Sequence, residues 1–367
     1  MTAAPPPPTR FPEFVAAGSP RAIGQAIGEG FRESIRGLCE ITLERFNLAA
    51  AVPVTAARAD EVVAAAIPHA EAFLPDAMAE LRATAAAAGV PFERLMLLNV
   101  RSALAAPATP ATSAGEGCTS VMIGAGLAAS GIGFAGQNWD NDPAMDGYSA
   151  VVTRRPTGKP AFMSWCQPGV IAYMGLSDAG FGLCLNALNG PSRRDGVGWY
   201  FMVRAIFEQT RTADIIELIG RARRAMSANA ALITPDGPLD LEIMPDSVEL
   251  LRAGPDEALV HTNHCLHARL SANNERYAAA IYGGSFDRKA RAEQLLAGRT
   301  RVSVADLQAL LADRQGYPGS INRYPGLDPR TGFQRSVVSV IVEPAAGRMH
   351  VTRGNPGDMP YEVYRLD

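Results

Sequence analysis

The chain has 367 residues, of which 47% are hydrophobic and 19% are charged, and 34 Lys and Arg against 37 Asp and Glu give it a net charge of -3. These values are typical of a globular protein with a large core, and they exclude the concentrated basic surface that nucleic-acid binding requires. The sequence has no run of about 20 apolar residues, so we expect no membrane-spanning segment. The first residues lack the charged and apolar segments of a signal peptide, so we expect no signal peptide.

Residues 1–117 have the pattern of a helical segment that begins with a disordered tail, residues 1–17. Ser19 and Pro20 supply an N-cap and a first-turn proline. Apolar residues then recur at helical spacing from Ile23 to Ile41, which predicts one long helix. Three more helices are expected, in residues 55–67, 75–87 and 92–104.

A run of small residues and prolines, residues 105–117, predicts a mobile linker between this segment and the rest of the chain. From Cys118 onward, residues 118–367, short apolar runs alternate with turn residues and with helical stretches. Hairpins dominate over strand-helix-strand units, so we expect an α+β fold of two packed, mostly antiparallel sheets with helices outside them.

Cys118 stands at the border between the linker and the first buried strand, which suggests that the chain is cut there. A thiol on a new N-terminal residue could use its own α-amine, whose pKa of about 7.7–8.0 lies near neutrality, as general base. The same thiol could make the cut by attacking the Gly117 carbonyl, and glycine suits this because its backbone tolerates strained conformations. An inert buried cysteine is the alternative.

The five cysteines are odd in number and widely spaced, which is not the pattern of a disulfide framework. We therefore expect a reducing compartment, the cytoplasm.

Polar residues follow two of the expected strands. Asp140 could orient the amine or thiol of Cys118, and Asn138 could offer an amide donor, although an Asx turn before Pro143 explains the same run. Three histidines, His261, His264 and His267, stand three residues apart, but that spacing shares a face only on a helix and no carboxylate completes the set, so no metal is expected.

Four sequence words give the chain its resemblance to a family: Glu116-Gly117-Cys118-Thr119-Ser120, Gly136-Gln137-Asn138-Trp139-Asp140, His261-Thr262-Asn263-His264-Cys265 and Ser320-Ile321-Asn322-Arg323-Tyr324-Pro325. In this order they resemble the acyl-coenzyme A:6-aminopenicillanic acid acyltransferase family of N-terminal nucleophile (Ntn) hydrolases. The resemblance implies a four-layer αββα sandwich. It also implies a precursor that cuts itself between Gly117 and Cys118 into fragments that stay associated.

The resemblance further implies roles for single residues. Cys118 is the expected nucleophile, Asp140 the acid that orients its amine, and Asn263 a donor to the oxyanion. Asn186 matches a second oxyanion position, with Asn189 as a rival. An arginine that lowers the thiol pKa is also expected; Arg288 is our choice and Arg291 its rival.

The expected function is cleavage of linear amides, or acyl transfer, through an acyl-Cys118 thioester, with hydrolysis slightly favoured because water is always present. The expected partners are a small N-acyl amide or acyl thioester and the cleaved N-terminal fragment. No bound cofactor is expected, and acyl-coenzyme A could enter only as a substrate. The alternatives are an uncleaved binding module and a thiol peptidase that pairs Cys118 with His261 or His264.

Overall fold

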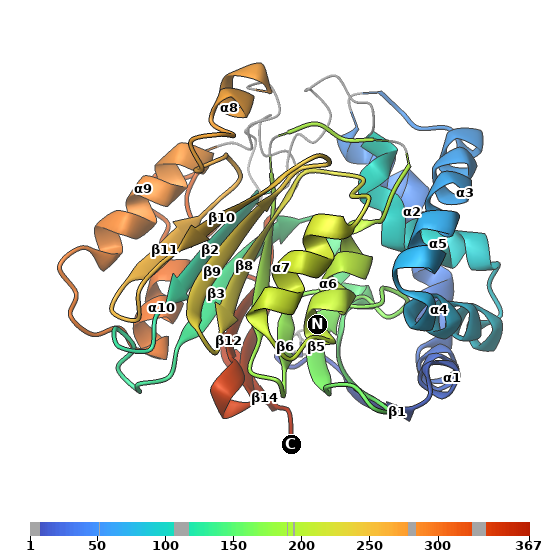
Figure 1. Cartoon of the computed structure of the whole chain (residues 1–367), viewed down its shortest axis with the longest axis horizontal. Helices are drawn as coiled ribbons and strands as arrows, with labels where there is room; N and C mark the ends of the chain where they lie inside the picture. The colour runs from blue at the N-terminus through green and yellow to red at the C-terminus, as the bar shows by residue number, and fades with distance from the viewer. Residues whose placement is uncertain are drawn as a thin grey trace, which may run out of the picture.

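Two β-sheets pack face to face, and helices cover their outer surfaces (Figure 1). The computed structural model of the chain describes residues 8–50, 52–105, 117–188, 190–193, 195–277, 284–324 and 335–367. Within these residues one sheet has eight strands and the other six. All strand pairs are antiparallel except that of the first strand, which confirms the expected α+β class.

The eight-stranded sheet has the order β1-β4-β5-β6-β7-β8-β9-β10. Its strands are β1 (Glu13–Gly18), β4 (Ala150–Pro156), β5 (Phe162–Cys166), β6 (Gly175–Ser177), β7 (Gly182–Ala187), β8 (Ala228–Thr234), β9 (Gly237–Ile243) and β10 (Val248–Arg252). The six-stranded sheet has the order β11-β2-β3-β12-β13-β14. Its strands are β2 (Gly117–Ile123), β3 (Phe134–Asn141), β11 (Ala258–His261), β12 (Arg335–Glu343), β13 (Arg348–Arg353) and β14 (Tyr361–Arg365).

The helices divide between the two outer surfaces. The N-terminal group, on the right of Figure 1, consists of α1 (Pro20–Gly30), α2 (Arg32–Ala49), α3 (Ala56–Phe73), α4 (Pro75–Ala88) and α5 (Phe92–Val100), followed by the 3-10 turn η1 (Arg101–Ala105). Next to this group lie α6 (Trp199–Phe207) and α7 (Thr212–Arg221). On the opposite side are α8 (Ala272–Arg276), α9 (Ser285–Leu296) and α10 (Val304–Leu311). Short 3-10 turns, η2 (Pro143–Tyr148) and η4 (Pro344–Ala346), complete the described elements.

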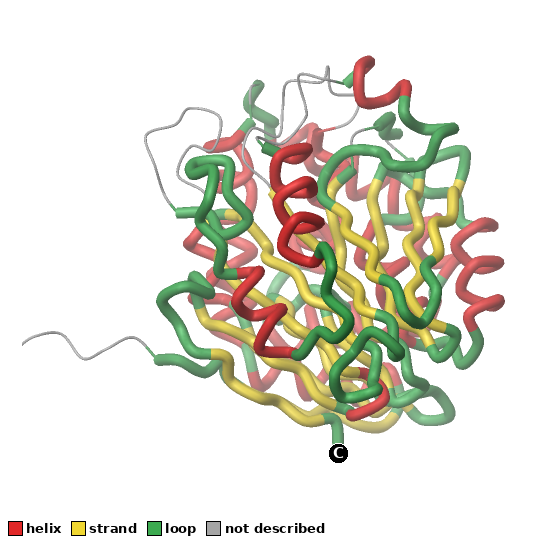
Figure 2. Tube along the Cα trace, turned by 90° about the vertical axis from the view of Figure 1, so that its left-hand side faces the viewer, coloured by secondary structure: helices red, strands yellow, loops and turns green. Residues whose placement is uncertain are grey.

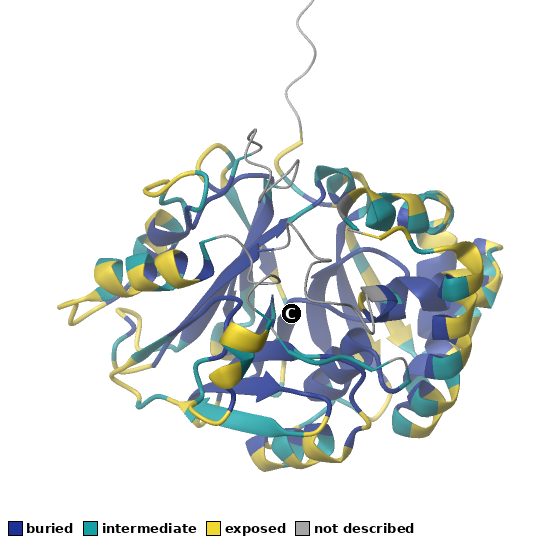
Figure 3. Ribbon diagram, turned by 90° about the horizontal axis from the view of Figure 1, so that it is seen from above, coloured by how far each residue is buried: buried dark blue, intermediate teal, exposed yellow. Residues whose placement is uncertain are grey.

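The core lies between the two sheets. Strands β2 and β3 are buried along nearly their whole length, with Cys118 and Trp139 among the residues that face the eight-stranded sheet. Seen from above in Figure 3, buried residues fill the centre and exposed residues lie on the outer helices. Figure 2 shows the same arrangement from the side, with strands at the centre and helices around them. Burial of this kind is the main stabilising contribution to the fold.

Residues 13–18 form β1, so the prediction of a disordered tail over residues 1–17 is wrong for its last part. β1 pairs in parallel with β4, and Phe11 packs against Trp165 with ring centroids 5.9 Å apart. The helical segment before the linker therefore contributes a strand to the larger sheet. Because parallel pairing needs no hairpin, the local sequence gave no turn signal for this strand.

The long helix expected from Ile23 to Ile41 is two helices, because Phe31 leaves helical geometry at φ -121° and ψ 26°. The ring of Phe31 packs edge-on against the ring of Phe14 of β1, with centroids 5.2 Å apart. Gly30 also lies against the Phe14 ring. The break thus follows from packing against a strand that comes earlier in the chain.

Within the described part of the chain, no helix combines the length and the apolar character needed to cross a membrane.

Candidate active site

Cys118 is the second residue of β2 and is 3% exposed. It lies opposite Trp139 of β3, and Gly117 lies opposite Asp140. Because side chains alternate along a strand, Cys118 and Trp139 face the inter-sheet core, whereas Thr119 and Asp140 face α9 and α10. The peptide bond between Gly117 and Cys118 therefore has the Cys118 thiol on one face of the sheet and the Asp140 carboxylate on the other.

Asn263 and Arg288 hold the backbone of Cys118. The amide nitrogen of Cys118 donates to Oδ1 of Asn263 at 3.0 Å, and Nη2 of Arg288 donates to the same oxygen at 2.7 Å. Nη1 of Arg288 donates to the Cys118 carbonyl and, at 2.9 Å, to Oγ1 of Thr119. The structure thus brings together Asn263 and Arg288, two residues that lie far apart in the sequence and were each expected in the site.

Asn263 is fixed in turn by its neighbours. Its backbone nitrogen donates to Oγ of Ser285 at 3.0 Å, and its Nδ2 donates to the Ala187 carbonyl at 2.9 Å. In this intact chain the Asn263 side chain therefore acts as an acceptor toward Cys118. The Ala187 carbonyl takes one of the two Nδ2 hydrogens, which leaves the second for the donor role expected of Asn263 at an oxyanion.

Asp140 lies against the residue before Cys118. Oγ of Ser336 donates to its Oδ1 at 2.6 Å, and Nε of Arg323 is 3.6 Å from its Oδ2. Oδ2 is buried and accepts no hydrogen bond from the described residues. A Cβ atom placed on Gly117 would lie 2.8 Å from this oxygen and 2.9 Å from Nη1 of Arg323. The free carboxylate oxygen is therefore directed at Gly117.

The site is a buried cluster of three charged groups, all fully inaccessible to solvent: Asp140, Arg288 and Arg323. Burial raises the pKa of Asp140, and the positive charges of Arg323 and Arg288 oppose that rise. Burial, followed by repulsion from Arg323, lowers the pKa of Arg288 to about 10, while Asp140 and Cys118 act in the opposite direction. A negative charge on Cys118 would thus be favoured by the arginine that contacts its carbonyl.

Arg323 is the site residue that sequence reasoning missed. Its backbone nitrogen donates to Oγ of Ser336, the same hydroxyl that donates to Asp140. Arg323 belongs to one of the four sequence motifs that carry the family resemblance, but the sequence predicts no role for this residue. A buried aspartate needs a cationic partner, and that need was the signal that could have found it.

The two candidate arginines, Arg288 and Arg291, lie in different environments. Arg288 lies inside the cluster, whereas Arg291 is partly exposed and pairs with Asp313, with Nη2 2.7 Å from Oδ2. Successive turns of α9 thus direct one arginine inward and the other to the surface.

Asn186 of β7 approaches the site from the other sheet. Its Oδ1 accepts a hydrogen bond from Oγ of Ser120 at 2.8 Å, and its Nδ2 is buried without a hydrogen-bond partner among the described residues. Ser120 faces the same side of β2 as Cys118, so this unused donor lies on the side of the Cys118 thiol. Its rival Asn189 lies outside the described residues. Asn138, a candidate donor from the sequence, instead donates its Nδ2 to the carbonyls of Leu311 and Ile321.

The three histidines have separate partners. His261 contacts Glu242 and the Thr262 carbonyl, His264 contacts Ser285 at 2.8 Å, and His267 lies 3.5 Å from Glu249. Among the described residues, no three or more His, Cys, Asp or Glu side chains form a group that could hold a metal ion. Both ring nitrogens of His261 are thus already engaged away from Cys118.

Comparisons with known proteins agree with the family suggested by the sequence words. The chain is 28% identical over 231 residues to the acyl-coenzyme A:6-aminopenicillanic-acid-acyltransferase 40 kDa form of Emericella nidulans, which covers 62% of this chain and 62% of that protein. The chain thus spans less than two thirds of the length of this curated relative.

Solved structures also show similarity. A variant of conjugated bile acid hydrolase from Clostridium perfringens covers 68% of this chain and 97% of its own, with 9% identity and a TM-score of 0.46. Penicillin V acylase from Agrobacterium tumefaciens covers 68% of this chain and 86% of its own, with 8% identity and a TM-score of 0.42.

The model of one family matches residues 128–358, a stretch that begins after Cys118 and includes Asp140, Asn263 and Arg323. That match covers more than half of the chain, and the chain therefore belongs to the acyl-coenzyme A:6-aminopenicillanic acid acyl-transferase family.

Proposed function

We propose that the chain cuts itself between Gly117 and Cys118 and that Cys118, as the new N-terminal residue, transfers acyl groups from linear amides or thioesters. One observation carries the proposal: polar side chains from distant parts of the sequence converge on this peptide bond. Asn263 accepts the Cys118 N–H, Arg288 donates to the Cys118 carbonyl, and a free oxygen of Asp140 lies against Gly117.

The cut begins with attack of the Cys118 thiol on the Gly117 carbonyl. The carbon–sulfur bond forms, the carbon–nitrogen bond breaks, and the thiol proton passes to the departing nitrogen. Water then opens the Gly117 thioester, which leaves a carboxylate on Gly117 and a free α-amine and thiol on Cys118. Asp140 and Asn263 would each present an acceptor oxygen to that amine, since both already lie beside this bond.

In turnover, the α-amine takes the thiol proton and sulfur attacks the acyl carbonyl of the substrate. The unused Nδ2 of Asn186 would donate to the resulting oxyanion, a contact whose removal in other enzymes costs about 2.7–4 kcal/mol. The ammonium then returns its proton to the leaving amine or thiol. An acyl-Cys118 thioester remains, which water or an amine opens.

Family membership supports acyl transfer, and the choice between water and an amine as acceptor depends on what reaches the thioester. The substrates are therefore proposed as a class, small N-acyl amides or acyl thioesters. The thiol-peptidase alternative finds less support, because both ring nitrogens of His261 are engaged with Glu242 and Thr262.

The test is to trap the acyl-enzyme. Processed protein is incubated with a panel of N-acyl amides and acyl thioesters, quenched in acid, and examined by mass spectrometry for acyl addition to the peptide that begins at Cys118. We expect at least one substrate to give a hydroxylamine-labile adduct there. The matched control is Cys39→Ala, which removes a half-buried thiol of α2 and should leave labelling unchanged. Absence of any Cys118 adduct across the panel would favour the alternative, a binding module.

A further inference from the structure

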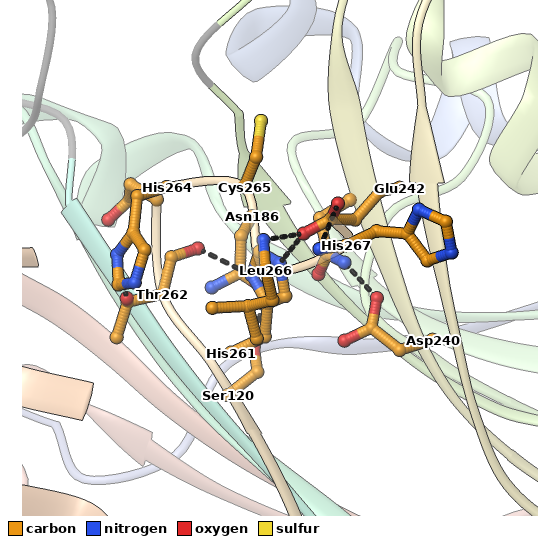
Figure 4. A network of polar contacts seen from close by, with 12 residues as sticks. Ser120, Asn186, Asp240, Glu242, His261, Thr262, His264, Cys265, Leu266 and His267 are labelled. Carbon is orange, nitrogen blue, oxygen red and sulfur yellow. Dashed lines mark hydrogen bonds and ion pairs between the residues drawn. The ribbon is translucent and has the colours of Figure 1, made fainter. Parts of the chain in front are cut away.

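Glu242 of β9 has a buried carboxylate that lies outside the site. It joins the eight-stranded sheet to the segment that follows β11 of the other sheet. Its Oε1 accepts hydrogen bonds from Nε2 of His261 at 2.9 Å and from the backbone nitrogen of Leu266 at 2.5 Å. Its Oε2 accepts from the backbone nitrogen of His267 at 3.1 Å. One side chain thus receives three donors (Figure 4).

The donors lie at the two ends of a short segment, residues 261–267, and Asn263 lies between them. Figure 4 shows this segment curving around Glu242, with His261 on one side and Leu266 and His267 on the other. Asn263 is the residue whose Oδ1 receives both the Cys118 nitrogen and Nη2 of Arg288. The position of that oxygen therefore depends on how the segment is held.

The first of the three donors, Nε2 of His261, belongs to a charged imidazole ring. Both ring nitrogens of His261 face acceptors, Glu242 and the Thr262 carbonyl, which is the pattern of a protonated imidazole. Burial alone would lower the pKa of His261, but the charges of Asp240 and Glu242 raise it. Asp240 is two residues from Glu242 on β9 and therefore shares its face. Hydrogen bonds between charged groups are roughly twice as strong as neutral ones, so the contact between His261 and Glu242 is a strong one.

We propose that Glu242 is a positioning residue that fixes Asn263 against Cys118 by clamping both ends of the 261–267 segment. The inference rests on the function proposed above, because Asn263 matters only where Cys118 reacts. The hydrogen bonds of Glu242 to described residues go to His261, Leu266 and His267 and not to Cys118, so its effect passes through Asn263.

Replacement of Glu242 by glutamine tests the clamp with almost no change of volume. Glutamine keeps one acceptor oxygen and replaces the other with an NH2 donor, which would face a backbone N–H or the protonated ring of His261. At least one of the three contacts must then be lost. In enzymes, a displacement of about 1 Å at a positioning residue can cost about 100-fold in rate.

The matched control is Glu249→Gln. Glu249 lies directly opposite Glu242 on the neighbouring strand β10. It contacts the same segment through His267 at 3.5 Å, and it contacts Arg269, which follows the segment, at 3.7 Å. The Arg269 side chain is largely exposed, and exposed ion pairs contribute little. The same chemical change therefore acts on the same segment without touching the clamp.

The experiment uses processed full-length protein and 4-nitrophenyl acetate, an ester whose leaving group needs no protonation and so keeps weak variants measurable. We expect Glu242→Gln to lower kcat for 4-nitrophenolate release by about tenfold to 100-fold with KM within about twofold, because the contact acts on the reacting state rather than on binding. Glu249→Gln should stay within about twofold of wild type in both constants. Unfolding transitions and the processed fraction, measured on each variant, normalise the rates.

A double-mutant cycle separates positioning from general loosening. In an Asn263→Ala background, Glu242→Gln should cost less than about twofold, since the residue it positions is gone. Equal losses in the two backgrounds, or wild-type kcat in Glu242→Gln, would overturn the positioning role. A wild-type protein that shows no Cys118-dependent release would contradict the proposed function instead, so the two failures can be told apart. Hydrogen exchange at the Leu266 and His267 amides adds a readout without catalysis: it should quicken in Glu242→Gln only.

Discussion

Glycine at position 117 is required by space rather than by backbone conformation. Gly117 is absent from the described glycines with positive φ, so the strained backbone expected from the sequence is not the reason for this residue. The reason is instead the approach of Asp140 and Arg323 to its Cα atom. A side chain here would push apart the two groups that lie beside the Gly117–Cys118 bond.

Gly117→Ala should therefore slow self-cleavage. The added Cβ would meet Asp140 Oδ2 at 2.8 Å, and overpacking of this kind costs about 1–3 kcal/mol, or roughly tenfold in rate. The rate is followed by gel electrophoresis of freshly translated chains. Gly147→Ala is the control, because a Cβ there would have no atom within 4 Å. Equal cleavage rates in the two variants would count against close packing at the cut.

Arg323 compensates the buried charge of Asp140, and its loss should appear as instability. Arg323→Met leaves the carboxylate with Arg288 as its remaining cation, and removal of one partner from a buried pair typically costs about 3–5 kcal/mol. Denaturation in urea measures the free energy of unfolding. Arg291→Met, which removes a partly exposed arginine paired with Asp313, should change it by less than about 1 kcal/mol. Similar losses in both variants would contradict the assignment of Arg323 to the buried cluster.

His264 should make stability depend on pH. Burial, followed by the positive charge of His261, lowers its pKa to about 4, from 6.5. Between those values the unfolded chain binds more protons, so this contribution is fully present above pH 6.5 and is lost as the pH falls toward 4. At most it amounts to about 3 kcal/mol, since one pKa unit corresponds to about 1.4 kcal/mol.

His264→Asn keeps a polar atom near Ser285 and removes the titration. Its free energy of unfolding should therefore fall less steeply than that of wild type between pH 6.5 and 4. Asp240, whose pKa burial raises to about 6, acts in the opposite direction in both proteins and cancels in the comparison. Parallel curves for the two proteins would refute a neutral, buried His264.

At the scale of elements, the N-terminal segment is joined to the rest of the chain by a strand and by buried charge. Glu80 of α4 pairs with Arg154 of β4 at 2.8 Å and with Arg204 of α6 at 2.7 Å, and Arg204 also pairs with Glu208. All four side chains are at most 4% exposed. Burial would raise the pKa of Glu80, but the charges of Arg204 and Arg154 lower it. A cut before Cys118 therefore leaves Glu80 on one fragment and both arginines on the other.

Glu80→Gln should weaken the association of the processed fragments. Two buried arginines would lose a charged partner, at a cost of about 3–5 kcal/mol, and the thermal midpoint of the processed pair should fall. Glu71→Gln is the control, since Glu71 forms an exposed contact with Arg82 inside the same fragment. Differential scanning calorimetry compares the two; an unchanged midpoint in Glu80→Gln would mean that the buried charges do not hold the fragments together.

Across the whole molecule, the sequence predicted those features whose causes are local. Helical spacing and capping residues placed both ends of α4 and the start of α3 within one residue, whereas α3 runs six residues beyond its expected end (73 - 67 = 6). What it did not predict depends on partners far away in the chain: β1 pairs with β4, and the break at Phe31 follows from packing on Phe14. The same holds in the site, where Arg323 becomes identifiable only once Asp140 is seen to be buried beside it.

Placement of the functional residues follows the same division. Cys118, Asp140 and Asn263 each stand at the end of a strand beside a polar run, which is why the sequence could nominate them. The sequence did not predict which of these residues donate and which accept hydrogen bonds. Asn263 is an acceptor toward Cys118 because Ala187, from the other sheet, already takes its Nδ2, and the unused donor belongs to Asn186.

The central claim, that the nucleophile is made by cleavage before Cys118, is tested most directly by intact-mass and N-terminal analysis of the purified protein. The account predicts two associated fragments of 117 and 250 residues (367 - 117 = 250), about 12 kDa and about 26 kDa by their share of the length, the larger beginning at Cys118. It also predicts an intact, inactive chain for Cys118→Ala. A fully active wild-type protein that remains a single chain of 367 residues would contradict it.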